Sequence, residues 1–322
     1  MVLNRMALST LRAEIDDEVS TILASHFKIS VTNTAGVPHS ADPSITFPNL
    51  DTKSQGTKLL ETTVLYVDMR RSTQLSFQHR RETVAKLYTA FVRATTRVAK
   101  YFGGEVRGII GDRVMVIFDQ ANCFGRAFDT AILINSVCKY IINSRFPHNQ
   151  VEFGVGIDYG RMMATKTGVR RQGAAQQSYR SLVWLGRPAN VASKLTDNAN
   201  KPEETVDLVV INVRYDYGIG PVWNDEWPHE FLKQFTYNPL NGLHTHWNPA
   251  FREFRYTIKK FIKRPKTPPI LITEAVYTGL KRERPTEPSI VKGWLASTDL
   301  KIPDYPGTIY GCDVIYTDVK GR

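Results

Sequence analysis

Cysteine is scarce in this sequence, and long apolar runs are absent. The 322 residues include three cysteines, Cys123, Cys138 and Cys312, and neither these nor the seven histidines cluster at the spacing of a zinc site. Scattered cysteines are typical of a reducing compartment, where Cys138 packs as a small hydrophobic side chain. No stretch is apolar for long enough to cross a membrane, and the N-terminus lacks the apolar core of a secretion signal. We therefore expect a cytoplasmic protein without membrane contact.

Acidic residues are fewer than basic ones. The formal net charge of +11 and the pI near 9.5 favour polyanionic partners such as nucleic acids or nucleoside triphosphates. No zinc finger, helix-turn-helix or alternation of aromatic and basic residues points to nucleic acid, and the densest basic runs, residues 255–266 and 281–284, are typical of solvated faces. The hydrophobic and charged fractions, 42% and 23%, are those of a globular protein that buries one large core or two small ones.

The first 57 residues are predicted to form a helix and a linker. Ser9 can cap a helix that runs to about residue 27. Its apolar residues recur at three- and four-residue steps and form one stripe, suited to lie on the main body or on a partner subunit: Leu11, Ile15, Val19 and Ile22. Residues 33–57 are rich in Pro, Ser, Thr and Asp without periodicity, which indicates a linker. Residues 58–318 are then the main domain.

The segment from about residue 59 to 200 alternates strands and helices in the order strand, helix, strand, strand, helix, strand, helix. One helix carries Leu87, Phe91, Ala94 and Val98 on a single face, and a second is expected over residues 121–144. This βαββαβ order predicts an α+β fold, with antiparallel strand pairs and helices on one face of the sheet. Residues 201–268, rich in Trp, Pro and His, are read as an insertion with one strand at 208–213. Residues 270–277 are expected to be a strand that enters a helix, and 310–316 a closing edge strand.

Two aspartates are expected at neighbouring strand ends. Asp68 ends an apolar run, and Asp112 follows Gly111 in a tight turn between two further runs. The helix between them, about residues 73–101, would pack their strands side by side. Paired carboxylates of this kind bind hard divalent cations, and two such ions promote attack on a phosphoryl group. The alternatives are that Asp68 caps a helix and that Asp112 is an ordinary turn residue.

Two further segments carry polar residues at defined spacing. Residues 154–161 form a glycine-rich strand that ends at Arg161. In residues 185–195, Asn190 and Lys194 lie one helical turn apart on the same face. An amide and a cation so placed can hold a ribose and stabilise charge on a phosphate. Alternatively, Asn190 caps the helix and Lys194 is solvated.

In this order, the four pieces resemble the class III nucleotidyl cyclases, over about residues 61–200 and again over 270–316. The resemblance implies a ferredoxin-like βαββαβ core, with the N-terminal helix and the C-terminal insertion as additions. It also implies a head-to-tail homodimer with composite active sites. Each site would bind a nucleoside triphosphate and convert it to a 3′,5′-cyclic nucleotide and pyrophosphate. No Ser/His/Asp or Cys nucleophile is needed, and none is apparent.

The resemblance also implies roles for single residues. Two divalent ions, Mn²⁺ or Mg²⁺, would lie on Asp68, Met69 and Asp112. Arg161 would bind the triphosphate on the same chain, while the second chain would supply Asn190 for the ribose and Lys194 for the transition state. Lys194 stands where the family usually has arginine, so a catalytically silent nucleotide-binding module is an alternative. Four backbone amides at the start of the first helix would donate hydrogen bonds to phosphate oxygens, those of Arg70, Arg71, Ser72 and Thr73.

The two positions that read a purine in this family are Gly108 and Val183 here, and neither can hydrogen-bond to a base edge through its side chain. In this respect the chain resembles the bacterial anti-phage pyrimidine cyclases, whose product is read by a separate effector. We expect conversion of UTP to cyclic UMP, with CTP as an alternative and ATP or GTP as less favoured substrates. The candidates for base contact can equally be packing residues: Tyr66, Arg107, Tyr179 and Trp184.

Overall fold

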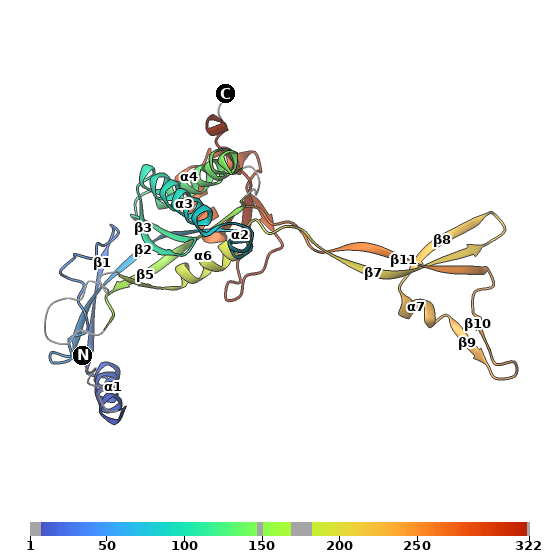
Figure 1. Cartoon of the computed structure of the whole chain (residues 1–322), viewed down its shortest axis with the longest axis horizontal. Coiled ribbons are helices and arrows are strands. Elements are labelled where there is room, and N and C mark those ends of the chain that lie inside the picture. The colour runs from blue at the N-terminus through green and yellow to red at the C-terminus, as the bar shows by residue number, and fades with distance from the viewer. Residues whose placement is uncertain (1–7, 147–150, 169–181, 321–322) are drawn as a thin grey trace. The chain divides into compact units, whose positions relative to one another are not determined.

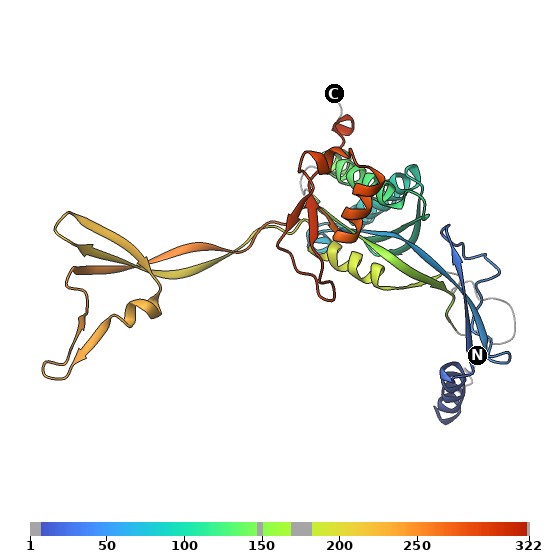
Figure 2. The same cartoon turned by 180° about the vertical axis from the view of Figure 1, so that it is seen from behind.

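The computed structural model describes residues 8–146, 151–168 and 182–320, and these fall into two compact units. The first unit combines residues 1–201 with residues 267–322, and the second comprises residues 202–266. Figure 1 shows both along the chain, and Figure 2 shows the reverse view. Because the second unit is compact by itself, it is more than the single-strand elaboration expected from the sequence.

A mixed sheet forms the centre of the first unit. Its strands lie in the order β13-β14-β12-β5-β2-β4-β3, with β1 also paired to β2 and β6 to β5. The predicted βαββαβ order is present within it, and the pairs β5-β2, β2-β4 and β4-β3 are all antiparallel. The α+β prediction is therefore confirmed. These core elements are β2 (Ser54–Met69), α3 (Arg81–Tyr101), β3 (Gly104–Ile110), β4 (Arg113–Phe118), α4 (Cys123–Val137) and β5 (Phe153–Thr165).

Further elements extend this core at both ends of the chain. The strand predicted to enter a helix near residue 270 is present, and β12 runs parallel to β5. The expected closing strand is short, and β13 lies outside it at the sheet edge. The remaining elements of this unit are α1 (Leu8–Leu23), β1 (Lys28–Thr34), α2 (Ser72–Gln78), a π-helical turn (Cys138–Ile142), α5 (Asn143–Arg145), β6 (Val183–Leu185), α6 (Arg187–Asn198), β12 (Ile270–Thr273), α8 (Glu274–Glu283), α9 (Pro288–Val291), β13 (Ala296–Thr298), β14 (Ile309–Cys312) and a 3₁₀ turn (Thr317–Lys320).

Helices cover both faces of the sheet, whereas the sequence analysis expected them on one. Alternate residues of β2 point to opposite faces. Leu65 and Val67 pack in the core formed with α3 and α4, while Leu60 and Val64 pack against residues of α6. Close contact between α6 and β5 depends on Gly156, where an added Cβ would lie 2.3 Å from the Ala192 carbonyl oxygen.

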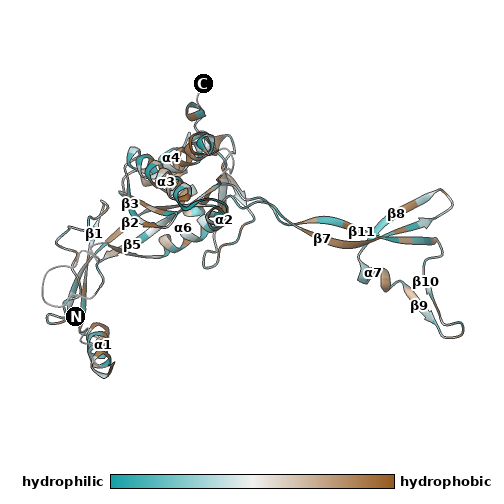
Figure 3. Cartoon of the chain, viewed as in Figure 1, coloured by the Kyte–Doolittle hydropathy of each residue, from teal (hydrophilic) through white to brown (hydrophobic). Residues whose placement is uncertain are grey.

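The N-terminal part differs from the predicted helix and linker in one respect. Within residues 33–57, β1 ends and β2 begins, and the two strands pair in parallel. The helix itself is α1, which buries none of its residues within the described part of the chain. Its stripe is 38–51% exposed, and Figure 3 shows hydrophobic and hydrophilic residues side by side along α1. No helix in the described ranges is long and apolar enough to cross a membrane.

The second unit has its own small sheet and core. Strands β8, β7 and β11 pair antiparallel, and β9 and β10 form a separate hairpin. Side chains from β7, α7 and the residue before β11 fill the core: Ile211, Val213, Tyr215, Phe231 and Ala250. The elements are β7 (Glu204–Asp216), β8 (Pro221–Glu226), α7 (Pro228–Leu232), β9 (Phe235–Asn238), β10 (Leu243–His246) and β11 (Phe251–Arg264).

Candidate functional site

Asp68 and Asp112 lie at one edge of the sheet, as the sequence predicts. The β2–β4 register ends with Val67 opposite Val114, so Asp68 is the next residue beyond the paired segment. Asp112 lies in the two-residue turn that joins β3 to β4. Glycine precedes it because the backbone of Gly111 has a φ of +60°, in the left-handed region. The hairpin turn thus brings the second carboxylate to the end of the strand that carries the first.

The charge of Asp68 acts on Asp112. The pKa of Asp112 is raised, first by burial and then by the negative charge of Asp68, and a hydrogen bond with Ser72 opposes this shift. One buried oxygen of Asp112, Oδ2, has no hydrogen-bond partner among the described residues. A desolvated oxygen beside a second carboxylate suits a cation. In the described ranges no group of three or more His, Cys, Asp or Glu side chains is arranged to hold a metal ion, so the candidate side-chain ligands are these two aspartates.

The alternative role for Asp68, a helix N-cap, is excluded. Arg71 is the N-cap of α2, in the left-handed conformation with a φ of 57°, and no side chain caps this helix. The side chain of Asp68 instead accepts a hydrogen bond from Arg113, with 2.8 Å between Nη2 and Oδ2. Met69 follows Asp68, and its side chain is buried in the core, 2% exposed, so only its backbone is available to a ligand.

Arg113 is a site residue that the sequence analysis missed. Its guanidinium bonds not only Asp68 but also two residues of α6: Nη1 donates to Ser193 Oγ at 2.7 Å, and Nη2 pairs with Asp197. The side chain of Arg113 is 25% exposed. Because its partners are 45 to 84 residues away in sequence, no local pattern could reveal the cluster.

At the start of α2, only some of the backbone amides predicted to bind phosphate are available for it. The amide of Arg70 donates to the carbonyl of Glu152 at 2.7 Å, so it is not available to a phosphate. Arg71 is the N-cap, and the amides of Ser72 and Thr73 open the helix, where the first turn leaves donors without intrahelical partners. Burial lowers the pKa of the Arg70 guanidinium, against the nearby charge of Asp68.

Arg161 does not lie beside the two aspartates of its own chain. The β2–β5 register pairs Asp68 with Gly154 and Glu61 with Arg161. These pairs are separated by seven residues of β2 (68 minus 61), which is about 23 Å at ~3.3 Å per residue. The exposed guanidinium contacts Glu61 at 3.6 Å instead. The expectation that one chain joins Arg161 to the metal aspartates is therefore wrong, because an antiparallel pair carries the end of β5 away from the carboxylates.

Asn190 and Lys194 both lie within α6. The cap of this helix is Gly186, so the alternative that Asn190 caps it is excluded. Asn190 is exposed. Lys194 is neither free nor simply solvated: its Nζ lies 2.6 Å from Asp304 Oδ2 and donates to the Pro303 carbonyl at 3.1 Å. A turn between β13 and β14 therefore holds the cation.

The residues expected near a base have mixed surroundings. Tyr66 donates its hydroxyl to Met115 Sδ at 3.0 Å, and both pack on the α6 side of the sheet. Trp184 packs in the same cluster, and its buried Nε1 has no partner among the described residues. Arg107 is the extra residue of a bulge between Val106 and Gly108, where a side chain is redirected.

The other two base positions are small or apolar. An added Cβ on Gly108 would lie 3.5 Å from Met115, an ordinary contact, so this position has space for a side chain. Val183 is paired with Thr165 at the far end of β5. Tyr179 lies outside the described residues. Neither Gly108 nor Val183 has a side chain that can hydrogen-bond to a purine edge.

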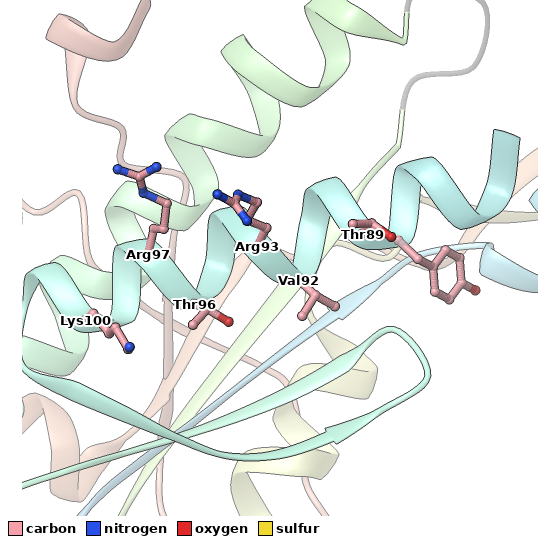
Figure 4. Close-up of a pocket in the computed structure, with 7 residues that line it drawn as sticks. Thr89, Val92, Arg93, Thr96, Arg97 and Lys100 are labelled. Carbon is pink, nitrogen blue, oxygen red and sulfur yellow. The ribbon is translucent and has the colours of Figure 1, made fainter. Parts of the chain in front are cut away.

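A groove along α3 adjoins the predicted site at Tyr88, whose pKa is raised first by burial, with the charges of Asp112 and Asp68 adding to the shift. Figure 4 shows Arg93 and Arg97 on the side of α3 away from the β3–β4 hairpin, and Val92 and Thr96 on the side that faces it. The wall is formed by one helix, and it contains none of the residues assigned to metal, phosphate or base. The groove is therefore a neighbour of the candidate site, not the site itself.

Comparison with known proteins identifies a related domain. Residues 55–211 match the family described as adenylate and guanylate cyclase catalytic domain. A uridylate cyclase of Burkholderia cepacia is 32% identical over 149 residues, which is 45% of this chain and 62% of that protein. A uridylate cyclase of Propioniciclava tarda is 27% identical over 235 residues, covering 68% of this chain and 73% of that protein.

A solved structure is also similar at low identity. The adenylyl cyclase CyaB from P. aeruginosa is 15% identical, with 79% of this chain and 94% of that chain covered and a TM-score of 0.45. The chain spans less than two thirds of the length of the Burkholderia relative.

Proposed function

We propose that the protein is a nucleotidyl cyclase, because residues 55–211 match the family described as adenylate and guanylate cyclase catalytic domain. The ribose 3′-hydroxyl of a nucleoside triphosphate would attack the α-phosphorus. A bond forms between O3′ and phosphorus, the bond to the β-phosphate oxygen breaks, and pyrophosphate leaves. The observation that carries the proposal is the pair Asp68 and Asp112 at adjacent strand ends, inside the matched domain. Because nucleophile and target share one molecule, positioning and charge stabilisation suffice for catalysis.

The carboxylate pair supports binding of two divalent ions, Mn²⁺ or Mg²⁺. Asp68 and Asp112 would be the side-chain ligands, and Met69 would offer its backbone carbonyl. The buried Asp112 oxygen without a partner supports this assignment. When bound, such ions lower the pKa of the attacking hydroxyl and neutralise phosphate charge. The amides of Ser72 and Thr73 would add donors for phosphate oxygens, with the dipole of the helix that they open.

The second chain of a head-to-tail homodimer would complete each site. Asn190 would orient the ribose, and Lys194 would stabilise the charge that builds on the phosphate. Lys194 must then leave Asp304, whose carboxylate it contacts at 2.6 Å. Since Arg161 lies about 23 Å along β2 from Asp68 of its own chain, we assign its triphosphate contact to the partner's site. A silent nucleotide-binding module stays the alternative, because lysine lacks the bidentate fork of arginine.

UTP is the proposed substrate, and cyclic UMP the product. Two observations support a pyrimidine: the similar proteins are named uridylate cyclases, and Gly108 and Val183 have no side chain that hydrogen-bonds to a purine. CTP is the second candidate. Tyr66, Arg107 and Trp184 are the proposed base contacts. We propose further that a separate effector in the cytoplasm reads the product, as a signal in anti-phage defence.

A competition assay tests substrate and reaction together. The full-length protein is given equal concentrations of UTP, CTP, ATP and GTP with Mn²⁺, and cyclic products are identified by chromatography and mass spectrometry. Cyclic UMP is expected to exceed the purine products by about tenfold or more, since missing partners for a base edge cost that much discrimination. Dominant cyclic AMP or cyclic GMP would contradict the pyrimidine proposal. Absence of any cyclic product would favour the silent module.

A further inference from the structure

Arg113 lies where three polar side chains converge. Its Nη2 contacts Asp68 Oδ2 at 2.8 Å and also pairs with Asp197, while Nη1 donates to Ser193. Ser193 and Asp197 are one helical turn apart in α6, so both point from one face of that helix. One guanidinium therefore connects the end of β4, the end of β2 and α6.

The neighbouring carboxylates need a positive charge. Asp68 follows the last residue of β2 that pairs with β4, and Asp112 lies in the turn that leads into β4, so the two carboxylates are neighbours at one edge of the sheet. In the described structure, Arg113 supplies that charge to Asp68. A divalent ion shared by the two aspartates would meet a guanidinium already bonded to one of its ligands, and like charges at this range repel.

Asp197 is a second carboxylate that can bind the Arg113 guanidinium. It is already in contact with Nη2, and its side chain is 50% exposed, against 15% for Asp68. Arg113 can therefore loosen its bond to Asp68 and keep its bonds to Asp197 and Ser193 without losing every partner. This motion requires a change in one side chain only.

We propose that Arg113 is a positioning residue that serves as the resident counter-ion of Asp68 and transfers its charge toward Asp197 when a divalent cation binds. The inference rests on the proposed metal site. The metal affinity of the free protein would then depend on two residues that do not touch the metal. Arg113 competes with the cation for Asp68, and Asp197 weakens this competition because it also binds Arg113. Through Ser193 and Asp197, the same step acts on α6, the helix of Asn190 and Lys194.

The test measures Mn²⁺ binding by electron paramagnetic resonance, without nucleotide and without turnover. Arg113→Gln removes the competing charge, so Mn²⁺ is expected to bind about tenfold more tightly. Asp197→Asn removes the negative charge of the second acceptor, so Arg113 stays more on Asp68 and binding is expected to weaken by about threefold. The double variant is expected to resemble Arg113→Gln, since Asp197 acts only through Arg113.

A charge-matched variant and a folding check separate the counter-ion role of Arg113 from a general effect of charge or of misfolding. Arg93→Gln removes an equal charge from an exposed position on α3 and is expected to leave Mn²⁺ binding within about twofold of wild type. If Arg113→Gln fails to fold by circular dichroism, Asp197→Asn decides alone, because its half-exposed side chain is not part of the core. Weaker binding in folded Arg113→Gln, or unchanged binding in Asp197→Asn, would overturn the proposal.

Failure of this inference can be told apart from failure of the proposed function. If wild type binds Mn²⁺ and Asp68→Asn abolishes that binding, the metal site stands, and only the response of the Arg113 and Asp197 variants decides the counter-ion role. If wild type binds no Mn²⁺ at millimolar concentration, the metal site and the counter-ion proposal both fail.

Discussion

At the scale of single residues, the surroundings of Asp112 in the folded chain favour its neutral form more than water does. Its ordinary pKa is 3.8, and burial together with Asp68 raises the pKa in the folded chain. Below pH 3.8 the carboxyl is protonated in both folded and unfolded chains and contributes no difference. As the pH rises toward the folded pKa, the unfolded chain loses its proton first and folding becomes less favourable. Above the folded pKa the full penalty is present.

Asp112→Asn is therefore expected to stabilise the metal-free protein at pH 7. Asparagine keeps the shape and removes the charge, so the melting temperature in EDTA should rise by a few degrees, and the gain should vanish near pH 3.5. Differential scanning calorimetry at the two pH values checks this, with the exposed Asp299→Asn as a matched control that should not change. A lower melting temperature for Asp112→Asn at pH 7 would show that the carboxylate is not penalised.

Residue types were easier to predict than their partners. Asp68 and Asp112 follow from two apolar runs and a glycine turn, which are local signals, and the structure brings them together. Arg113 and Asp304 gave no such signal, because each acts through a contact made across more than 40 residues. The separation of Arg161 from Asp68 depends on strand register, which motif order does not specify.

At the scale of elements, the position of α6 matters most for the proposed chemistry, since this helix bears Asn190 and Lys194. It packs on β5 through Gly156. An added Cβ there would lie 2.3 Å from the Ala192 carbonyl and 2.5 Å from the Thr196 amide, both backbone atoms that cannot rotate away. The helix must then shift as a unit.

Gly156→Ala is expected to lower both stability and turnover. Overpacking of this kind costs about 1–3 kcal/mol, and a displaced α6 would misplace the groups that it donates. Chemical denaturation and cyclase assays under native conditions measure the two effects. Gly36→Ala is the matched control, because the nearest atom to its added Cβ, Asp119 Oδ1, is 3.6 Å away. Normal turnover in a folded Gly156→Ala protein would mean that the position of α6 does not limit catalysis.

The sequence predicted the βαββαβ core because α3 buries one face and the strands are apolar runs, whereas α4 and β4 are buried on most sides and have no marked periodicity. Leu87, Phe91 and Val98 are buried as expected. It did not predict that α6 covers the opposite face, since the signal for that is a close backbone approach at Gly156. The sequence also predicted only one strand in residues 201–268, whereas the second unit contains several. Its strands carry many exposed apolar residues and charges, as in β11, where no residue is buried.

At the scale of the whole molecule, we propose that the enzyme acts as a dimer. Two features of the described chain favour a second copy: Asn190 is exposed on α6, and Arg161 lies about 23 Å along β2 from the aspartates. The exposed stripe of α1, Leu11, Ile15, Val19 and Ile22, is a further surface on which two copies can meet. In a two-fold dimer, each chain would give its aspartates to one site and its α6 residues to the other.

Complementation between two inactive variants tests this account most directly. Asp68→Asn and Asn190→Ala proteins are each expected to be inactive as homodimers. After subunit exchange, confirmed by native mass spectrometry, half the dimers are mixed, and each mixed dimer has one site with both lesions and one with neither. Cyclic nucleotide production should return to about a quarter of the wild-type rate. No recovery despite demonstrated exchange would contradict the account, because all catalytic groups would then act within one chain.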